Sequence, residues 1–259
     1  MWYDDNLYDP NSIDIAGFSQ ESKLRYVNTA ESACVKECLS QLEKYHFHVT
    51  SSNSPFTKVS DIERDSFTLY DKGDNLAAFL YGIRERTPKR YAFIVKDIQS
   101  IVPYFLDFYL VPNDQGDQKL YWKGKFSSNV YGVNDLSDGT KRFIALSTLF
   151  LQPKLPLTLV IEELELGLHP AAIGKLAGLI RSAAQRGCQV IVATQSTDLI
   201  SHFEAEGIVT VDQVDGESRF TRPKSENLTQ WMDEFSLADL WCRRIIANGQ
   251  PNPVFPKIQ

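Results

Sequence analysis

The sequence of 259 residues predicts an α/β fold in which helices flank a parallel sheet, preceded by a mixed helical and antiparallel segment. Two observations support this fold class. After Gly132, helical and strand-like segments alternate with short connections, which is typical of a parallel sheet. The expected strands contain near-continuous apolar runs, Leu157–Ile161 and Val190–Ala193, as strands covered on both faces require. Ligand sites in such sheets lie at the carboxyl ends of the strands.

The composition indicates a globular protein and excludes a membrane protein. Hydrophobic residues make up 43% of the chain, enough for a sizeable core. The longest apolar runs, 143–151 and 155–161, are far shorter than the roughly 20 residues of a membrane-spanning helix. The first residues lack the basic and apolar segments of a secretory signal, and four cysteines give no disulfide framework. We therefore expect a cytoplasmic protein with no membrane partner.

The N-terminal half of the chain predicts helices and one hairpin. Residues 1–28 lack periodicity, so we expect weak order there. From Asn28 to Tyr45, apolar residues recur at helical spacing and predict an amphipathic helix. Further helices are expected from Asp74 to Arg86 and from Pro88 to Pro103, and an antiparallel hairpin is expected from the runs 105–111 and 119–122 around the turn 113–116.

The C-terminal half supplies the predicted parallel sheet. Helices are expected at 137–151, 170–186 and 197–203, and strands at 157–162, 188–194 and 207–212. A short hairpin at Asp215-Gly216, polar helices around Trp231 and Trp241 and a Pro-rich tail follow. This organisation predicts a weakly ordered segment, a mixed subdomain, a sheet-containing core and a helical tail, at residues 1–28, 29–132, 133–222 and 223–259.

Two adjacent carboxylates, Glu162 and Glu163, end the first apolar strand of the core. Phosphoryl transfer needs one carboxylate to hold Mg²⁺ and a second group to orient or deprotonate the attacking water. Consecutive strand residues point to opposite faces, so the two acids would have different roles. The alternative interpretation is a strand that simply leaves the core at a charged turn. The segment Glu165-Leu-Gly-Leu-His169-Pro170 that follows disfavours this alternative.

A polar turn, Ser137-Asp138-Gly139-Thr140, opens the helix before that strand. Ser137 or Asp138 can cap the helix, and Gly139 permits close approach of an anion to the positive end of the helix. The arrangement suits a γ-phosphate. By itself such a turn is more often an ordinary helix cap, and only its position one helix ahead of the acidic strand favours the phosphate interpretation.

Gln195 follows the next apolar strand, Gln189–Ala193. Its amide can hydrogen bond to a γ-phosphate or to an attacking water. The same residues also suit a helix start, with Ser196 or Thr197 as the cap. Both interpretations stay open, and they are compatible.

These motifs together resemble the prokaryotic predicted AAA-type ATPases of the SMC and RecF class, which are ABC-type in their nucleotide chemistry. The resemblance extends from about Tyr45 to Pro251. It is carried by Tyr45-His-Phe-His48, Gly73-Asp-Asn75-Leu-Ala-Ala, Leu136-Ser-Asp-Gly-Thr-Lys-Arg142, Ile161-Glu-Glu-Leu-Glu-Leu-Gly-Leu-His-Pro170 and Ala193-Thr-Gln-Ser196. It implies an ABC-type P-loop NTPase-like sheet, with ATP and Mg²⁺ as cofactors.

The resemblance also implies a role for each motif. Glu162 would be the Mg²⁺-associated Walker B acid, Glu163 the catalytic base and Gln195 the counterpart of the switch histidine. The turn Ser137–Thr140 would be the signature that contacts ATP held by a partner, and His169 would lie at the dimer interface. The implied partner is a second copy or a Walker A-containing subunit, and DNA is a candidate ligand.

Two features depart from the family pattern. Leu164 stands where members commonly have proline, which is expected to loosen the turn after the acids. No Gly-x4-Gly-Lys-Ser/Thr occurs in the 259 residues, so the loop that grips ATP is not encoded here. We therefore expect the C-terminal part of such an ATPase, inactive in isolation. The alternative is an inert ATPase half that serves as a binding or regulatory module for a Walker A-containing partner.

Overall fold

The computed structural model describes residues 23–47, 54–214, 216–223, 228, 234–243 and 246. Most of the segment 1–28, the residue Trp231 and the Pro-rich tail lie outside these residues. The chain divides into two compact units, residues 1–41 and 42–259. The first contains α1 (Ala30–Ser40), which Thr29 caps by accepting a hydrogen bond from the Ser32 N–H at 3.1 Å.

The helix predicted over 28–45 is wrong beyond Ser40. Residues Leu42–Tyr45 form strand β1, which pairs in parallel with β7 (Thr158–Glu162). The pairing sets Tyr45 opposite Ile161 and buries its ring to 1% exposure. Burial and strand pairing therefore override the local helical spacing of this segment.

A three-stranded parallel sheet lies at the centre of the second unit, in the order β1-β7-β8, with β8 spanning Gln189–Ala193. Ile161 lies opposite Val192, and Glu162 lies opposite Ala193. Because all three strands run in one direction, their carboxyl ends meet at one edge of the sheet. The predicted α/β class, a parallel sheet flanked by helices, is confirmed.

The strand predicted at 207–212 does not join this sheet. Strand β9 (Thr210–Val214) instead pairs antiparallel with β10 (Glu217–Thr221), with Val214 opposite Glu217. Burial alternates along β9, and the strand contains the polar residues Asp212 and Gln213, which suits a solvated hairpin better than a strand covered on both faces. The hairpin predicted at Gly216 is confirmed, and Gly216 has the positive φ of 85° that such a turn requires.

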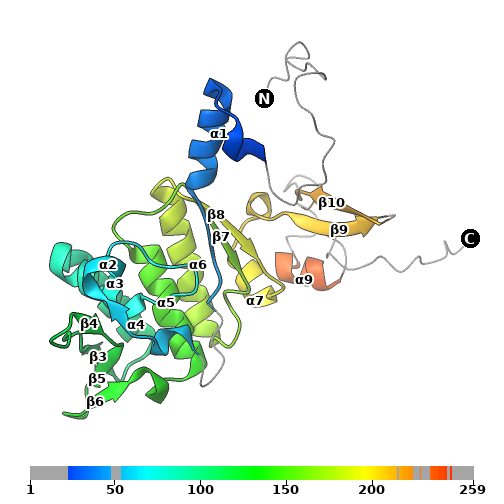
Figure 1. Cartoon of the computed structure of the whole chain (residues 1–259). Coiled ribbons are helices and arrows are strands. Elements are labelled where there is room, and N and C mark those ends of the chain that lie inside the picture. The colour runs from blue at the N-terminus through cyan, green and yellow to red at the C-terminus, as the bar shows by residue number, and fades with distance from the viewer. Residues whose placement is uncertain are drawn as a thin grey trace, which may run out of the picture. The chain divides into compact units, whose positions relative to one another are not determined.

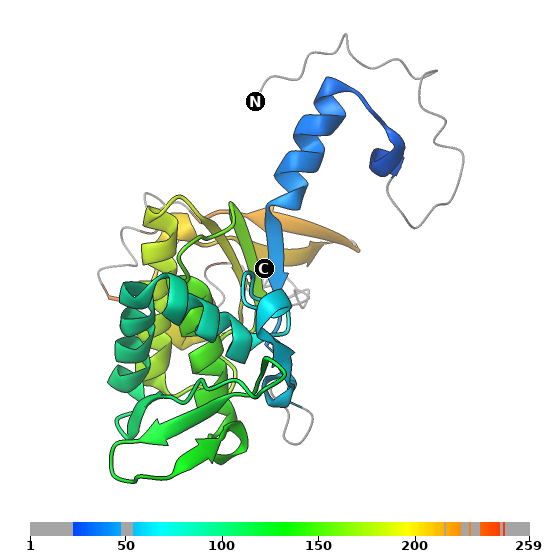
Figure 2. The same cartoon turned by 60° about the vertical axis from the view of Figure 1, so that its left-hand side comes forward.

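Four helices form a layer beside the sheet: α3 (Leu76–Arg86), α4 (Pro88–Ile101), α5 (Asp138–Leu151) and α6 (Pro170–Gln185) (Figures 1 and 2). A buried carboxylate joins three of them. Asp97 on α4 accepts a hydrogen bond from Ser147 Oγ on α5 at 2.9 Å and pairs with Lys175 Nζ on α6 at 3.1 Å. These contacts fix α5 and α6, the helices that precede and follow strand β7 in the chain.

An antiparallel segment packs below the helices in Figure 1. Strands β3 (Phe105–Phe108), β5 (Tyr121–Gly124) and β6 (Val130–Gly132) form one sheet, which confirms the predicted hairpin. Two short strands, β2 (Ser60–Asp61) and β4 (Asp117–Gln118), pair beside it, and α2 (Ile62–Asp65) follows β2. The Phe105 and Trp122 rings stack at 6.0 Å and anchor this sheet in the core.

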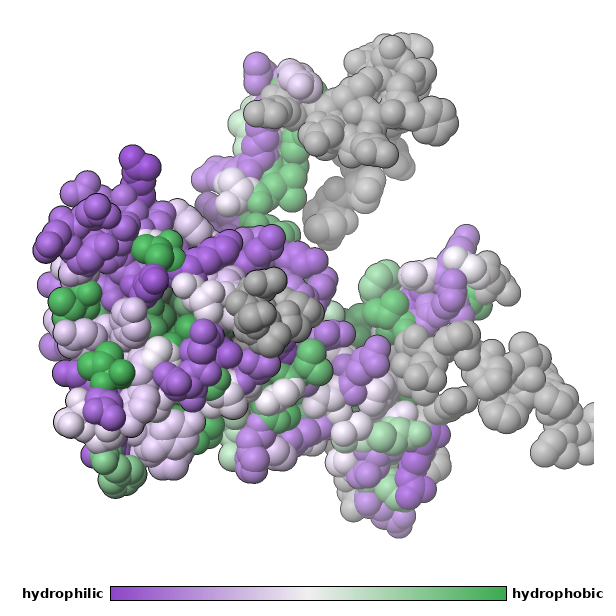
Figure 3. Space-filling model, turned by 60° about the horizontal axis from the view of Figure 1, so that its bottom comes forward, coloured by the Kyte–Doolittle hydropathy of each residue, from purple (hydrophilic) through white to green (hydrophobic). Residues whose placement is uncertain are grey.

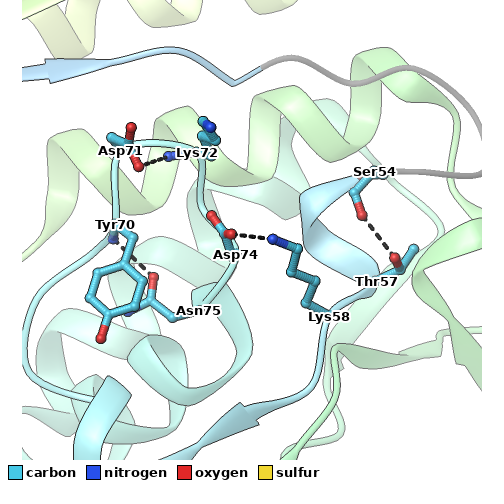
Figure 4. A network of polar contacts seen from close by, with 8 residues as sticks. All are labelled: Ser54, Thr57, Lys58, Tyr70, Asp71, Lys72, Asp74 and Asn75. Atoms are coloured by element: carbon cyan, nitrogen blue, oxygen red, sulfur yellow. Dashed lines mark hydrogen bonds and ion pairs between the residues drawn. The ribbon is translucent and has the colours of Figure 1, made fainter.

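The Gly73-Asp74-Asn75 motif holds a loop next to the end of β1 (Figure 4). The buried Asn75 side chain donates to the carbonyls of Asp65 (2.7 Å) and Thr68 (2.6 Å) and accepts from the Tyr70 N–H (2.9 Å). From this loop the Asp71 carbonyl accepts a hydrogen bond from the His46 N–H at 3.0 Å. The motif therefore positions the segment that follows β1.

The C-terminal elements build a second, smaller core. Helices α7 (Thr197–Ile200) and α9 (Leu237–Cys242) contact each other, and Ala205, Leu228 and Leu240 are buried nearby. The face in Figure 3 is mostly hydrophilic, with apolar residues in separate patches. Within the described ranges, no helix has both the length and the apolar character needed to cross a membrane.

Candidate functional site

Glu162 is the last residue of β7, and its carboxylate is exposed at the sheet edge. Lys44 Nζ from the neighbouring strand β1 lies 2.8 Å from Glu162 Oε1, and His46 Nδ1 lies 4.0 Å from Oε2. The Lys44 hydrogen bond and charge hold the pKa of Glu162 below its ordinary value. Glu162 is therefore an ionised, solvent-accessible carboxylate, as a ligand for a hard cation must be.

Glu163 is held in a rare backbone conformation. Its φ is 47°, in the left-handed region, and it is the single described non-glycine residue with positive φ. This conformation costs about 1–2 kcal/mol for a residue with a Cβ, so the surroundings must hold it. One support is the Glu163 N–H, which donates to the Ala193 carbonyl of β8 at 2.9 Å. The side chain stays exposed beside Glu162.

The turn after Glu163 is closed by its own backbone and by Arg142. The Leu166 N–H donates to the Glu163 carbonyl at 3.2 Å. Arg142 Nη1 on α5 donates to the Leu166 carbonyl at 2.6 Å and reaches the Glu163 carbonyl at 3.5 Å. Leu164, expected to loosen this turn, is 1% exposed and packs in the core. The turn is therefore fixed without a proline.

Ser137 caps α5 and leaves the rest of its turn accessible. Its Oγ accepts from the Thr140 N–H at 3.2 Å and lies 2.9 Å from Thr140 Oγ1. The exposed Asp138 pairs with Lys141 Nζ at 3.0 Å. The 14-residue helix α5 directs its positive end at this turn. An anion at Ser137–Thr140 would meet backbone N–H groups and a hydroxyl.

Gly139 brings this turn into contact with the segment that follows the acids. A Cβ atom at Gly139 would collide with the Gly167 carbonyl oxygen, so only glycine fits there. Gly167 itself has φ 75°. Together with Arg142, this contact joins the two predicted motifs, Ser137–Thr140 and Glu163–His169, within one chain.

The remaining predicted residues lie around the same edge. His169 is exposed and caps α6, since its Nδ1 accepts from the Ala171 N–H at 3.2 Å. Gln195 is exposed directly after β8, and Ser196 caps α7 by accepting from the Leu199 N–H at 3.2 Å. Thr194 Oγ1 donates to Glu165 Oε1 at 2.5 Å. The helix-start interpretation of Ser196 thus holds, and the Gln195 amide remains accessible to a ligand.

A small pocket of about 10 Å³ opens at this edge and is lined by His46, Phe47, Arg142, Leu146, Ile161, Glu162, Glu163 and Leu164. Its volume suits a single water molecule. Oxygen donors of Glu162 and Glu163 are the type that Mg²⁺ takes, usually one or two carboxylates completed by waters and phosphate. The two carboxylates therefore fit a magnesium ion that takes its other ligands from water and phosphate, since the described residues contain no group of three or more His, Cys, Asp or Glu side chains that could hold a metal ion.

Sequence reasoning missed Lys44 and Arg142. Lys44 reaches Glu162 because β1 pairs with β7 in the register Lys44 opposite Val160, and no local pattern reveals that register. Arg142 ends the Leu136–Arg142 motif, but the carbonyls to which it donates lie more than 20 residues further along the sequence. Only the folded arrangement assigns it a partner.

The Lys44–Glu162 pair gives a prediction. We expect Lys44→Gln to raise the pKa of Glu162 toward its ordinary value, because the largest cause of its depression is removed. An NMR titration of the Glu162 side-chain carboxyl measures this. Lys58→Gln removes the same charge from the distant Lys58–Asp74 pair and serves as the control. An equal response in both variants, or none in Lys44→Gln, would contradict the assignment.

We compared the chain with known proteins; it matches one family model, and it is similar at low sequence identity to several solved structures. A family model described as "AAA domain, putative AbiEii toxin, Type IV TA system" matches residues 43–201. No curated protein matches the chain.

Solved structures with similar folds include three described as SMC ATPases or SMC head domains. One, described as "Structural biochemistry of ATP-driven dimerization and DNA stimulated activation of SMC ATPases", is 17% identical with a TM-score of 0.44, and the match covers 60% of this chain and 96% of that one. An SmcHead bound to the C-winged helix domain of ScpA is 20% identical with a TM-score of 0.49, covering 68% and 54%. The SMC head domain from Thermotoga maritima is 16% identical with a TM-score of 0.40, covering 62% and 59%. The matched part thus spans little more than half of the last two proteins.

Proposed function

Because the chain belongs to the AAA-domain family described as a putative AbiEii toxin of a type IV TA system, we propose that it binds and hydrolyses ATP together with a partner. The observation that supports this most is the meeting of Glu162, Glu163 and Gln195 at the carboxyl ends of two adjacent parallel strands. This is the position at which α/β sheets bind ligands. The accessible turn Ser137–Thr140 lies against the same segment through Gly139 and Gly167.

In the proposed mechanism each group acts on its own part of the reaction. Glu162 would hold Mg²⁺, which when bound neutralises charge on the phosphates. Glu163 would take a proton from the attacking water, and Gln195 would orient that water or contact the γ-phosphate. Lys44 would leave Glu162 as the cation takes its place, because two cations compete for one carboxylate.

The phosphate-binding loop must come from outside these 259 residues, since no Gly-x4-Gly-Lys-Ser/Thr occurs within them. The sheet offers a place for it. Within the described part of the chain, β8 pairs with β7 alone. A strand added in parallel to β8 would end at the edge that carries Glu162, Glu163 and Gln195, so a loop following it would meet these side chains.

The turn Ser137–Thr140 would act on a nucleotide held by a partner. We expect Ser137→Arg to weaken ATP-dependent association at least about tenfold. The substitution removes the Ser137 hydroxyl, and the larger arginine side chain would occupy the space of the γ-phosphate. The probe is a Walker A-containing AAA domain of the same family whose own catalytic base is replaced by glutamine, so that hydrolysis in the complex depends on the acids of this chain. It is mixed in equal amounts with this chain and is hereafter called the phosphate-loop partner. Size-exclusion chromatography with and without ATP and Mg²⁺ follows the complex.

The control for this experiment is Ser128→Arg, which adds the same charge at an exposed turn between β5 and β6. It should associate like the unmodified chain. If Ser137→Arg still gave ATP-dependent association, the trans role of this turn would be wrong.

A binding module without hydrolysis is the second candidate. The observation that favours it is the missing phosphate-binding loop, since a chain that supplies only Ser137–Thr140 in trans needs no Glu163 chemistry. It predicts ATP-dependent association that is unaffected by substitution of Glu163. For either candidate we propose a role in defence against mobile elements or in DNA transactions, and the description of the family as a putative toxin of a type IV TA system supports the first of these.

A further inference from the structure

Arg142 lies between the two motifs whose roles are proposed above. Its side chain is 7% exposed, so the guanidinium has left water and must be satisfied inside the protein. Its partners are backbone carbonyls at both ends of one turn, Glu163 and Leu166. Burial lowers the pKa of Arg142, and the charges of Glu163 and Glu165 oppose that change.

The turn that Arg142 closes carries the strained residue. Glu163 adopts φ 47°, and its carbonyl accepts both the Leu166 N–H and the arginine. Removing the arginine would leave the turn with its own hydrogen bond and the link to Ala193. The left-handed conformation of Glu163 would then have fewer contacts to hold it, and its side chain would lose a fixed direction.

The same arginine belongs to the helix that carries the polar turn. Arg142 and the cap Ser137 lie within the first two turns of α5, so one continuous stretch of helix connects them. Gly139 touches Gly167 at the other end of the bridged segment. A displacement of the α5 N-terminus is therefore transferred to Glu163 through a direct hydrogen-bonded contact.

We propose that Arg142 is a positioning residue that holds Glu163 in its left-handed conformation and couples it to the Ser137–Thr140 turn. The coupling rests on the proposed function, whereas the holding of Glu163 does not. A nucleotide bound at Ser137–Thr140 would set the position of α5, and α5 would set the direction of the base. Each site would then be ready for hydrolysis only when the partner's nucleotide is in place.

Hydrogen exchange of the isolated chain tests the holding role. In Arg142→Met we expect the amides of residues 163–168 to exchange about tenfold faster, while β7 and α6 stay protected. Arg186→Met is the matched control. Arg186 also donates to backbone carbonyls at one end of α5, those of Phe150, Gln152 and Pro153. That end is the C-terminal one, and these bonds do not involve the turn 163–166. It should leave residues 163–168 unchanged.

A second substitution separates this role from general packing. Glu163→Gly removes the conformational cost at that position, so Arg142→Met should change exchange at 163–168 much less in the Glu163→Gly background. A purely structural arginine would give the same change in both backgrounds, which would overturn the proposal. If Arg142→Met does not fold, Arg142→Lys and Arg186→Lys allow the same comparison, because lysine keeps the charge but cannot span both carbonyls.

Kinetics with the phosphate-loop partner test the coupling. Arg142→Met should lower kcat about tenfold or more, with the KM for ATP within about twofold, because the base is misdirected while nucleotide binding persists. A changed KM with unchanged kcat would overturn the coupling. Failure of the proposed function gives a different result. In that case Glu163→Gln would leave ATP hydrolysis intact, while the hydrogen-exchange measurement would still decide whether Arg142 holds the turn.

Discussion

Glu163→Gln is expected to lower kcat for ATP hydrolysis about 100-fold or more in the complex with the phosphate-loop partner. A general base contributes a factor of this order, and the amide cannot take a proton from water. ATP-dependent association should persist, since the amide keeps the size of the side chain and the left-handed turn is held by backbone contacts. Phosphate release under single-turnover conditions measures the chemical step directly.

Glu85→Gln is the control for this experiment, because Glu85 is an exposed acid on α3 that pairs with Arg84 at 3.0 Å. It should hydrolyse ATP at the unmodified rate. Full activity of Glu163→Gln would exclude Glu163 as the base, and association without hydrolysis in both variants would favour the binding-module candidate.

The second large effect is expected on stability. Asp97→Ala removes the carboxylate that joins α4, α5 and α6, and it leaves the fully buried Ser147 hydroxyl without its acceptor. We expect the free energy of unfolding to fall by about 2–3 kcal/mol. This value is smaller than the roughly 3–5 kcal/mol lost when a fully buried ion pair is broken, because Lys175 is 41% exposed and can regain water. Urea denaturation measures the loss.

A double substitution shows where the loss arises. Asp97→Ala combined with Ser147→Ala should cost less than the sum of the two single changes, since the orphaned hydroxyl is gone. Glu85→Ala, which removes an exposed acid, should change stability by less than about 0.5 kcal/mol. Additive effects of Asp97 and Ser147 would mean that their hydrogen bond does not contribute.

Elements with strong local patterns could be predicted from the sequence. Strands β7 and β8 are near-continuous apolar runs, and α5 and α6 begin at Ser137 and His169-Pro170, where the residue types themselves are typical caps or first-turn residues. The same local patterns also predict that Glu162 and Gln195 lie at one edge of the sheet. Alternating strands and helices indicate parallel strands, whose carboxyl ends share an edge.

Elements that depend on distant partners could not be predicted. Leu42–Tyr45 has helical spacing and becomes a strand only because β7 lies beside it. Likewise β9 prefers its antiparallel neighbour β10 to the parallel sheet. The left-handed conformation of Glu163 and the contacts of Lys44 and Arg142 arise from tertiary packing, which neither spacing nor composition encodes.

Among the described residues, one side of β8 pairs with no strand, and this has a consequence for the behaviour of the purified chain. Three of its five residues, Gln189, Ile191 and Ala193, are exposed, and the strand carries no charged residue or proline. Natural proteins usually protect such strands with lysine, proline or a bulge, because unpaired backbone groups recruit strands from other molecules. Left uncovered, this strand invites self-association at high concentration, and a polypeptide that covered it would act as a chaperone for this chain as well as a partner.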